Sequence, residues 1–170
     1  QPGVMKESEN QTKGVNFNMT YMKDKFTMRA NVSVSESDSK NSPYGSFSQY
    51  TRLNPYYIPT DANGKPQKVL DNNTVSGQST VITNPLYDAT VGIKDLTNSL
   101  NVTTSIGLEY MILKNLRITE QFSYSRGMAG TDRFTPADHT SFELEDDLTR
   151  KGSYFKSSGN MLSWSSNMGI

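Results

Sequence analysis

The stretch from Phe26 to Ser35, FTMRANVSVS, alternates apolar and polar residues without interruption. Its apolar residues all have even numbers: Phe26, Met28, Ala30, Val32 and Val34. Successive side chains of a β-strand point to opposite faces, so the pattern predicts a strand with one apolar and one polar face. Such an apolar face rests either on the core of a soluble sandwich or on lipid hydrocarbon. These two environments imply different functions.

Four further segments alternate with varying regularity, and the last is the weakest because Lys156 and Asn160 share its apolar parity. Helix-like periodicity is limited to a possible turn in 141–150. The sequence therefore predicts an all-β, antiparallel protein. The predicted strands cover residues 4–22, 26–38, 94–113, 116–126 and 151–170.

The connections between these strands have very different lengths. Lys23–Lys25 and Lys114–Asn115 are tight hairpin turns, whereas 39–93 and 127–150 are long loops. Antiparallel strands reverse direction at each connection, so both tight turns fall at one end of the sheet and both long loops at the other. Outer-membrane barrels have this arrangement, with the long loops extracellular.

Other residues along the strands bear on a membrane location. Tyr21, Phe26 and Tyr110 lie close to the tight turns, where an interfacial aromatic girdle is expected. The alternation over Leu96–Leu113 is longer than the roughly 9–11 residues that cross a bilayer, so this strand would extend beyond the membrane. Glu120 is the exception, because it shares the apolar parity of its strand. A carboxylate facing lipid is costly and requires a bulge, a register change or a partner.

The composition excludes several functions. The 170 residues carry 17 Lys and Arg against 17 Asp and Glu, a balance without the basic surface that binds nucleic acid. No Cys is present, so neither a disulfide framework nor a thiolate metal site is possible. No run of about 18 apolar residues could form a transmembrane helix.

No catalytic or metal-binding motif is evident. His139 is the only histidine, and no nucleophile-elbow motif accompanies it; we expect it to make a local hydrogen bond in its loop. The carboxylates of Leu144–Arg150 lack the EF-hand pattern and are predicted to form a solvated loop. We predict no enzymatic activity, no cofactor and no metal site.

The loop segment YTRLNPYY gathers the candidate ligand-binding residues, which are Tyr50, Arg52, Tyr56 and Tyr57. Aromatic faces stack on sugar rings or peptide side chains, and Arg supplies directed hydrogen-bond donors. The alternative is that the tyrosines pack the loop against a barrel rim or a capping partner.

Several short motifs occur in a fixed order between the alternating segments. They are SPYGSFSQYTRLNPYYIPTDANGKP (Ser42–Pro66), NPLYDAT (Asn84–Thr90), ADHTSF (Ala137–Phe142) and KGSY (Lys151–Tyr154). In this order they resemble the SusC/RagA family of TonB-dependent outer-membrane transporters. The resemblance spans nearly the whole chain and depends on the order of the motifs rather than on any one of them.

The resemblance implies a transmembrane β-barrel of about 22 strands with a plug, located in the bacterial outer membrane. It also implies coupling to TonB, a SusD-like surface lipoprotein as partner, contact with outer-membrane lipid, and import of oligosaccharides or peptides as nutrients.

The chain is much shorter than such a transporter, and plug, TonB box and signal sequence are not seen in it. Even the smallest transmembrane barrels need about eight strands. We therefore expect residues 1–170 to be a partial barrel domain, an early-to-middle arc of the wall, with TonB reached through parts outside this chain. The alternative is a soluble secreted β-sandwich module that binds glycans, with one face of each strand on a core.

Overall fold

The structure, a computed structural model, describes residues 4–75 and 78–170. Strands dominate the described residues, and the helical segments are short. The elements are β1 (Glu9–Lys23), β2 (Phe26–Lys40), α1 (Phe47–Thr51), β3 (Val69–Val75), β4 (Gln78–Thr83), α2 (Pro85–Asp88), β5 (Lys94–Leu113), β6 (Leu116–Thr135), the 3₁₀ turns η1 (Thr140–Phe142) and η2 (Leu148–Arg150), and β7 (Ser153–Gly169).

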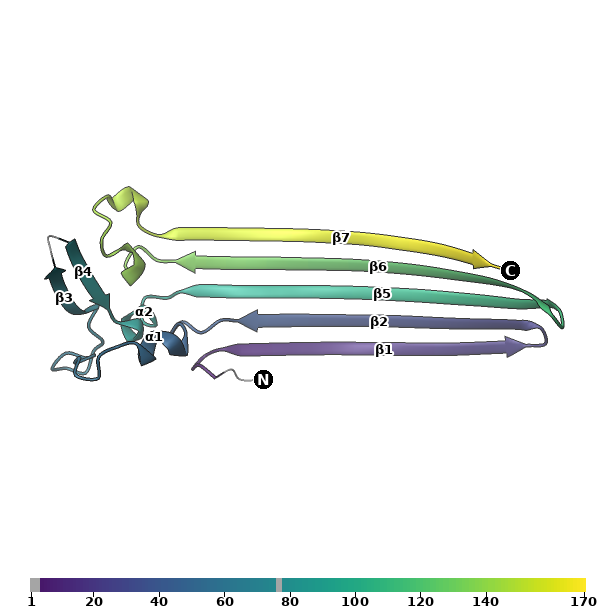
Figure 1. Cartoon of the computed structure of the whole chain (residues 1–170), viewed down its shortest axis with the longest axis horizontal. Helices are drawn as coiled ribbons and strands as arrows, with labels where there is room; N and C mark the ends of the chain where they lie inside the picture. The colour runs from purple at the N-terminus through teal and green to yellow at the C-terminus, as the bar shows by residue number, and fades with distance from the viewer. Residues whose placement is uncertain (1–3, 76–77) are drawn as a thin grey trace. The chain divides into compact units, whose positions relative to one another are not determined.

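The five long strands form one antiparallel sheet in the order β1-β2-β5-β6-β7 (Figure 1). β3 and β4 form a separate antiparallel pair. The prediction is confirmed for a mostly-β fold with an antiparallel sheet. The five-stranded sheet is open, and the described residues do not close it into a barrel.

Two tight turns connect the long strands at the same end of the sheet (Figure 1). Asp24 and Lys25 link β1 to β2, and Lys114 and Asn115 link β5 to β6, as the sequence predicts. Asp24 has a φ of 51°, in the left-handed region that two-residue hairpin turns use and that Asp tolerates better than most residues.

The long connections contain more structure than the sequence indicates. The range 39–93, expected to be one loop, holds both α-helices and the β3–β4 hairpin. β6 extends to Thr135, although a loop was expected from residue 127. β5 occupies its expected range. The ends of β1, β2 and β7 each differ from the expected ends by a few residues.

Glycines explain why the end of β6 was not recognised as a strand. A Cβ atom added to Gly127 would come within 3.1 Å of Asn101 Oδ1, and Gly130 faces the Asn98 side chain in the same way. Polar side chains of β5 thus occupy the space that β6 leaves open. The alternation of apolar and polar residues is therefore weakened in the sequence at the end of β6.

The chain divides into two compact units. The loop unit comprises residues 1–10, 39–97 and 131–157, and the sheet unit comprises 11–38, 98–130 and 158–170. Apart from the two tight turns and Ile170, every residue of the sheet unit belongs to a long strand. The sheet unit is thus a single layer, without a second layer to cover either face.

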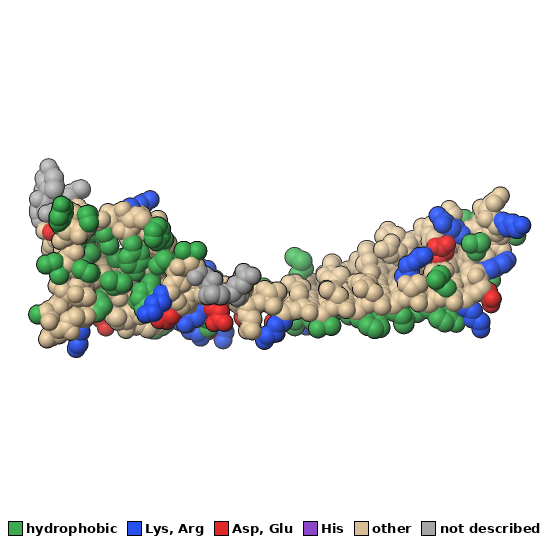
Figure 2. Space-filling view, turned by 90° about the horizontal axis from the view of Figure 1, so that it is seen from below, with side chains coloured by type: hydrophobic (Ala, Val, Ile, Leu, Met, Phe, Trp, Pro, Cys, Tyr) green, Lys and Arg blue, Asp and Glu red, His purple; other side chains and the backbone are tan. Residues whose placement is uncertain are grey.

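Neither unit contains a hydrophobic core in the part of the chain that the structure describes, where no large hydrophobic side chain is fully buried. All residues of β1, and all of β7 except the last, are exposed. In Figure 2 hydrophobic side chains line the lower side of the sheet unit, and its upper side is mostly polar. The alternation of the sequence therefore becomes one apolar and one polar face.

A buried asparagine organises the loop unit. Asn84 is only 1% exposed and donates from Nδ2 to the carbonyl oxygens of Pro59 at 2.8 Å and Gln67 at 2.7 Å. Its Oδ1 accepts from the Leu86 N–H at the start of α2, as an N-cap. One side chain therefore holds the segment before β3 against the helix that follows β4.

We expect Asn84→Ala to loosen this part of the loop unit. The change removes a helix cap and the side-chain donor to the Gln67 and Pro59 carbonyls, of which Pro59 keeps the Gln67 N–H, and it should lower the local opening free energy by about 1–3 kcal/mol. Hydrogen exchange of residues 59–68 and 84–88 measures the effect. Asn63→Ala, at an exposed turn position, is the matched control; equal exchange in both variants would contradict the assignment.

Candidate functional site

The four candidate ligand-binding residues divide into two pairs. Tyr50, in α1, donates its hydroxyl to the Tyr44 carbonyl at 2.8 Å, and Tyr57 donates to Asp71 Oδ2 at 3.2 Å. Arg52 and Tyr56 are exposed, Tyr56 to 89%. Two of the predicted residues therefore anchor the loop internally and two face solvent. Ligand binding by this group stays a prediction.

A short turn sets the direction of the two adjacent tyrosines. Asn54 accepts from the Tyr56 N–H through Oδ1 at 3.1 Å and from the Tyr57 N–H through its carbonyl at 3.1 Å. Such Asx turns are frequent for Asn before a reversal of the chain. They leave Tyr57 half-buried and Tyr56 projecting outward.

Burial shifts the titration of both anchored tyrosines. Loss of hydration, reinforced by the nearby Asp71 carboxylate and its hydrogen bond, raises the pKa of Tyr57. Loss of hydration also raises the pKa of Tyr50, with smaller contributions from Tyr44 and Asp88. Both hydroxyls therefore stay neutral, and able to donate a hydrogen bond, to a higher pH than an ordinary tyrosine does.

Asp88 links the two long connections within the loop unit. Its carboxylate accepts from the Thr140 N–H at 2.9 Å and from the Thr140 hydroxyl at 2.7 Å, across 52 positions of sequence. Thr140 is buried. Lys68 and Glu143 add an ion pair of 2.6 Å, and the hydrogen bond to Glu143 raises the pKa of Lys68. The two connections are thus held together by polar contacts that sequence reasoning did not find.

His139 makes the local hydrogen bond that the sequence predicts. Its Nδ1 accepts from the Ser141 N–H at 3.0 Å and caps η1. Its Nε2 lies 3.7 Å from the Asp88 carboxylate, so the ring also faces the contact between the two connections. The Ser141 hydroxyl also lies 2.9 Å from Nδ1 of His139. The absence of enzymatic activity stays a prediction.

The acidic stretch at 144–150 is used for local structure. Asp147 caps η2 by accepting from the Thr149 hydroxyl at 2.7 Å and the Thr149 N–H at 2.9 Å, and these bonds lower the pKa of Asp147. Glu145 lies 3.7 Å from Arg150. Among the described residues, no group of three or more His, Cys, Asp and Glu side chains is placed to hold a metal ion.

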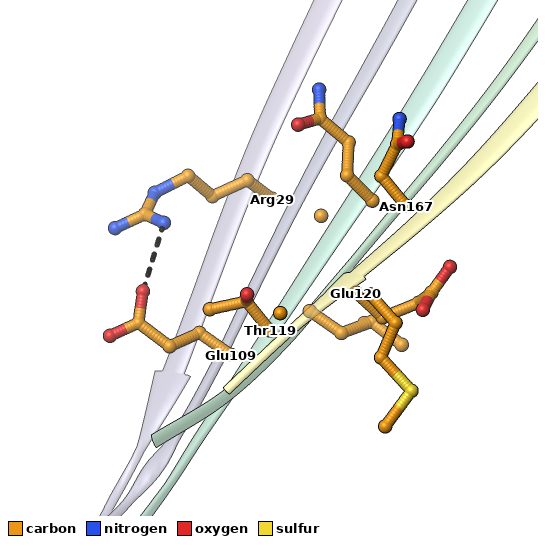
Figure 3. Close-up of a pocket in the computed structure, with 10 residues that line it drawn as sticks. Arg29, Glu109, Thr119, Glu120 and Asn167 are labelled. Carbon is orange, nitrogen blue, oxygen red and sulfur yellow. Dashed lines mark ion pairs between the residues drawn. The ribbon is translucent and has the colours of Figure 1, made fainter. Parts of the chain in front are cut away.

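Three charged residues from neighbouring strands meet on the polar face of the sheet unit. The Glu109 carboxylate of β5 lies 3.7 Å from Arg29 of β2 and 3.8 Å from Arg117 of β6. Figure 3 shows Arg29 and Glu109 pointing toward one another. Both arginines are mostly exposed, so each pair contributes only about 0–1 kcal/mol to stability. The group supplies polar character and a net positive charge rather than rigidity.

A shallow hollow adjoins this group. Gly107 of β5 and Gly169 of β7 line it together with Thr119 of β6 (Figure 3). A Cβ atom at Gly169 would come within 2.8 Å of Thr119 Oγ1, so only glycine leaves the surface open there. The polar face is therefore slightly hollowed here and hydrophilic across several strands.

Glu120 has a partner on the neighbouring strand. The Ser166 hydroxyl of β7 donates to Glu120 Oε1 at 2.6 Å. Both residues have the parity of the apolar face, so each of the two strands places one polar residue on that face. This contact answers the question that Glu120 raised in the sequence.

A further candidate surface is the apolar face of the sheet unit. Its exposed side chains come from every one of the five strands and include Phe17, Val34, Leu108, Phe122 and Trp164. A contiguous apolar surface of this kind marks contact with a partner or a membrane. No helical segment of the described chain has the length and apolar character needed to cross a membrane.

We expect Asp71→Asn to lower the pKa of Tyr57 toward the ordinary value. A raised pKa means that the neutral hydroxyl's contribution to stability is complete below about pH 10 and is lost as the pH rises through the raised value. Near-UV titration of tyrosinate, compared with Tyr57→Phe, isolates the group. Asp146→Asn, at an exposed position, should leave the titration unchanged; an identical curve for Asp71→Asn would refute the assigned contact.

The sequence matches no known protein-family model, and no curated protein is similar to it. Membership of a family therefore stays a prediction, which depends on the sequence motifs and on the geometry of the sheet.

Proposed function

We propose that this chain is part of the wall of an outer-membrane β-barrel importer of the SusC/RagA type. The observation that carries the proposal is the single-layer sheet unit with one apolar and one polar face and no core between layers. A barrel wall is such a layer, with lipid on one side and an aqueous or plugged interior on the other.

The arrangement of the connections supports the proposal. Each of the two tight turns has two residues, whereas the β2–β5 and β6–β7 connections hold short helices, 3₁₀ turns and a hairpin. Outer-membrane barrels combine short periplasmic turns with long extracellular loops. By this comparison the two tight turns correspond to periplasmic turns, and the β2–β5 and β6–β7 connections correspond to extracellular loops.

The polar face suits a wet interior. It carries Ser, Thr and Asn side chains together with the Arg29–Glu109–Arg117 group. Charged residues are tolerated there because they meet water rather than hydrocarbon. The role is transport of nutrients such as oligosaccharides or peptides, with no catalytic step. A SusD-like lipoprotein at the outer mouth and TonB are the expected partners, the latter through parts outside this chain.

The competing function, a soluble glycan-binding sandwich, requires a second sheet over the apolar face. Sandwich sheets pack about 10 Å apart with interdigitating side chains. In the sheet unit, the described residues outside the long strands are only the two turns and Ile170, so no segment of that unit is available to form the second layer. The proposal of a barrel wall therefore accounts for more of the observations.

The single tryptophan tests which face meets lipid. Trp164 is 70% exposed and has the parity of the apolar face of β7. With the chain folded into phosphatidylcholine vesicles, lipids brominated in their acyl chains should quench its fluorescence strongly, and aqueous iodide should quench it weakly. The heavy atoms lie in the hydrocarbon that the proposal places against Trp164.

A one-position exchange provides the control. Trp164→Ser combined with Ser165→Trp moves the indole to the polar face, where iodide should quench it and brominated lipid should not. If brominated lipid fails to quench Trp164, or the chain unfolds cooperatively as a soluble monomer without detergent or lipid, the barrel proposal is wrong and a soluble module is favoured.

A charge placed on each face gives an energetic test. Ile106 and Ser105 are adjacent, half-buried residues of β5 on opposite faces. Ile106→Arg should reduce the free energy of folding into vesicles by about 2–4 kcal/mol, the cost of Arg near the bilayer centre. Ser105→Arg should change it by less than about 1 kcal/mol. Urea titrations followed by Trp164 fluorescence measure both, and equal losses would contradict the assignment of the faces.

A further inference from the structure

Arg126 of β6 is a charged residue on the apolar face of the sheet unit. It has the same parity as Phe122 and Tyr124, and its side chain is exposed. Among the described residues, the Arg126 side chain has no partner for an ion pair or a hydrogen bond. Glu120, on the same face of the strand, differs because it accepts a hydrogen bond from Ser166. The charge of Arg126 is therefore left uncompensated by the fold.

The cross-strand neighbours of this arginine are apolar. A Cβ atom on Gly127 would lie 3.1 Å from Asn101 Oδ1 of β5 and 3.9 Å from Met161 Cβ of β7, so these positions face one another. The strands are antiparallel, and one step back along β6 is matched by one step forward along both neighbours. The arginine thus lies between Val102 and Leu162.

The depth of Arg126 decides whether hydrocarbon can cover this part of the face. An Arg at the bilayer centre costs about 2–4 kcal/mol, against about 0–1 kcal/mol near an interface. β6 begins at Leu116, and with a rise of about 3.3 Å per residue and a tilt of about 45° Arg126 lies about 23 Å from that end. This is close to the far limit of an apolar band about 25 Å tall, where a guanidinium reaches lipid headgroups.

The apolar stretch of the face also ends on β1 and β2. On β2 the apolar residues end at Val34, and Glu36 and Asp38 follow with the same parity. On β1 Lys13 precedes Val15 with the same parity. These strands therefore change from apolar to charged residues toward the end that is remote from the tight turns, as expected where hydrocarbon gives way to headgroups.

We propose that Arg126 binds the phosphate of an anionic lipid headgroup at this limit of the apolar face. The site rests on the proposed barrel wall, which places lipid against the face. A guanidinium presents its N–H donors in a planar fork that matches phosphate oxygens. Its stem lies along apolar surface while the charged head reaches the headgroups, and anionic lipid attracts a basic residue at this depth.

The lipid dependence of folding tests the site. The full chain is folded into vesicles of phosphatidylcholine, alone or mixed equally with phosphatidylglycerol, and urea titrations followed by Trp164 fluorescence give the folding equilibrium constant. The anionic lipid should favour the wild-type chain about fivefold more than Arg126→Gln. Arg117→Gln, the matched change on the polar face of the same strand, should respond as the wild type does, within about twofold.

Solid-state NMR gives a second measurement that does not depend on stability. With isotope-labelled arginine, dipolar coupling to lipid phosphorus should dephase a guanidinium signal that Arg126→Gln removes and Arg117→Gln retains. Equal lipid response and equal dephasing in the wild type and Arg126→Gln would overturn the proposal. A gain in folding that inorganic phosphate reproduces in phosphatidylcholine vesicles would overturn it as well, because the ligand would then be the free ion.

The result is separable from that of the proposed function. Strong quenching of Trp164 by brominated lipid, with the same lipid response in the wild type and Arg126→Gln, would support the barrel wall and overturn the Arg126 site. Lack of quenching would overturn both, since the site requires lipid on this face.

Discussion

A one-layer β-sheet cannot bury its own apolar face. In the sheet unit the strands satisfy one another's backbone groups between β1 and β7, but no described large hydrophobic side chain is fully buried. Burial of apolar surface contributes about 25 cal/mol per Å² and is the main favourable term in folding. The free energy that orders these long strands must therefore come from an apolar environment outside the unit.

The loop unit also lacks a hydrophobic core, and hydrogen bonds between polar groups hold it together instead. The fully buried residues among those that the structure describes are polar or proline. Asn84 is satisfied by two carbonyls and an N–H, and Thr140 by the Asp88 carboxylate, whereas the buried Oδ1 of Asp132 has no hydrogen-bond partner. Buried polar groups without partners cost free energy, whereas fully paired ones fix a single geometry. Long connections held in this way can present Tyr56 and Arg52 outward in a defined position. A rigid outer surface is what recognition of a partner or substrate requires.

The sequence predicted the parts of the fold that depend on local pattern. Alternation located β5 completely, and two-residue spacing located both tight turns. The alternation did not predict the end of β6. There the Asn98 and Asn101 side chains of β5 fill the space above Gly130 and Gly127 of β6. The contact between Asp88 and Thr140 could not be predicted either, since 52 positions separate them. For the same reason the composition of YTRLNPYY did not reveal that Tyr57 turns inward to Asp71 while Tyr56 turns outward.

The position of Glu120 limits how a bilayer could cover the apolar face. For a strand that rises about 3.3 Å per residue and is tilted by about 45°, this residue near the start of β6 would lie only about 10 Å from the tight turn. A charge close to the interface costs about 0–1 kcal/mol, against about 2–4 kcal/mol at the centre. The hydrogen bond from Ser166 further compensates the carboxylate. Glu120 is therefore compatible with lipid on this face if the hydrocarbon begins near the tight turns, in which case the bilayer centre lies near the level of Ile106.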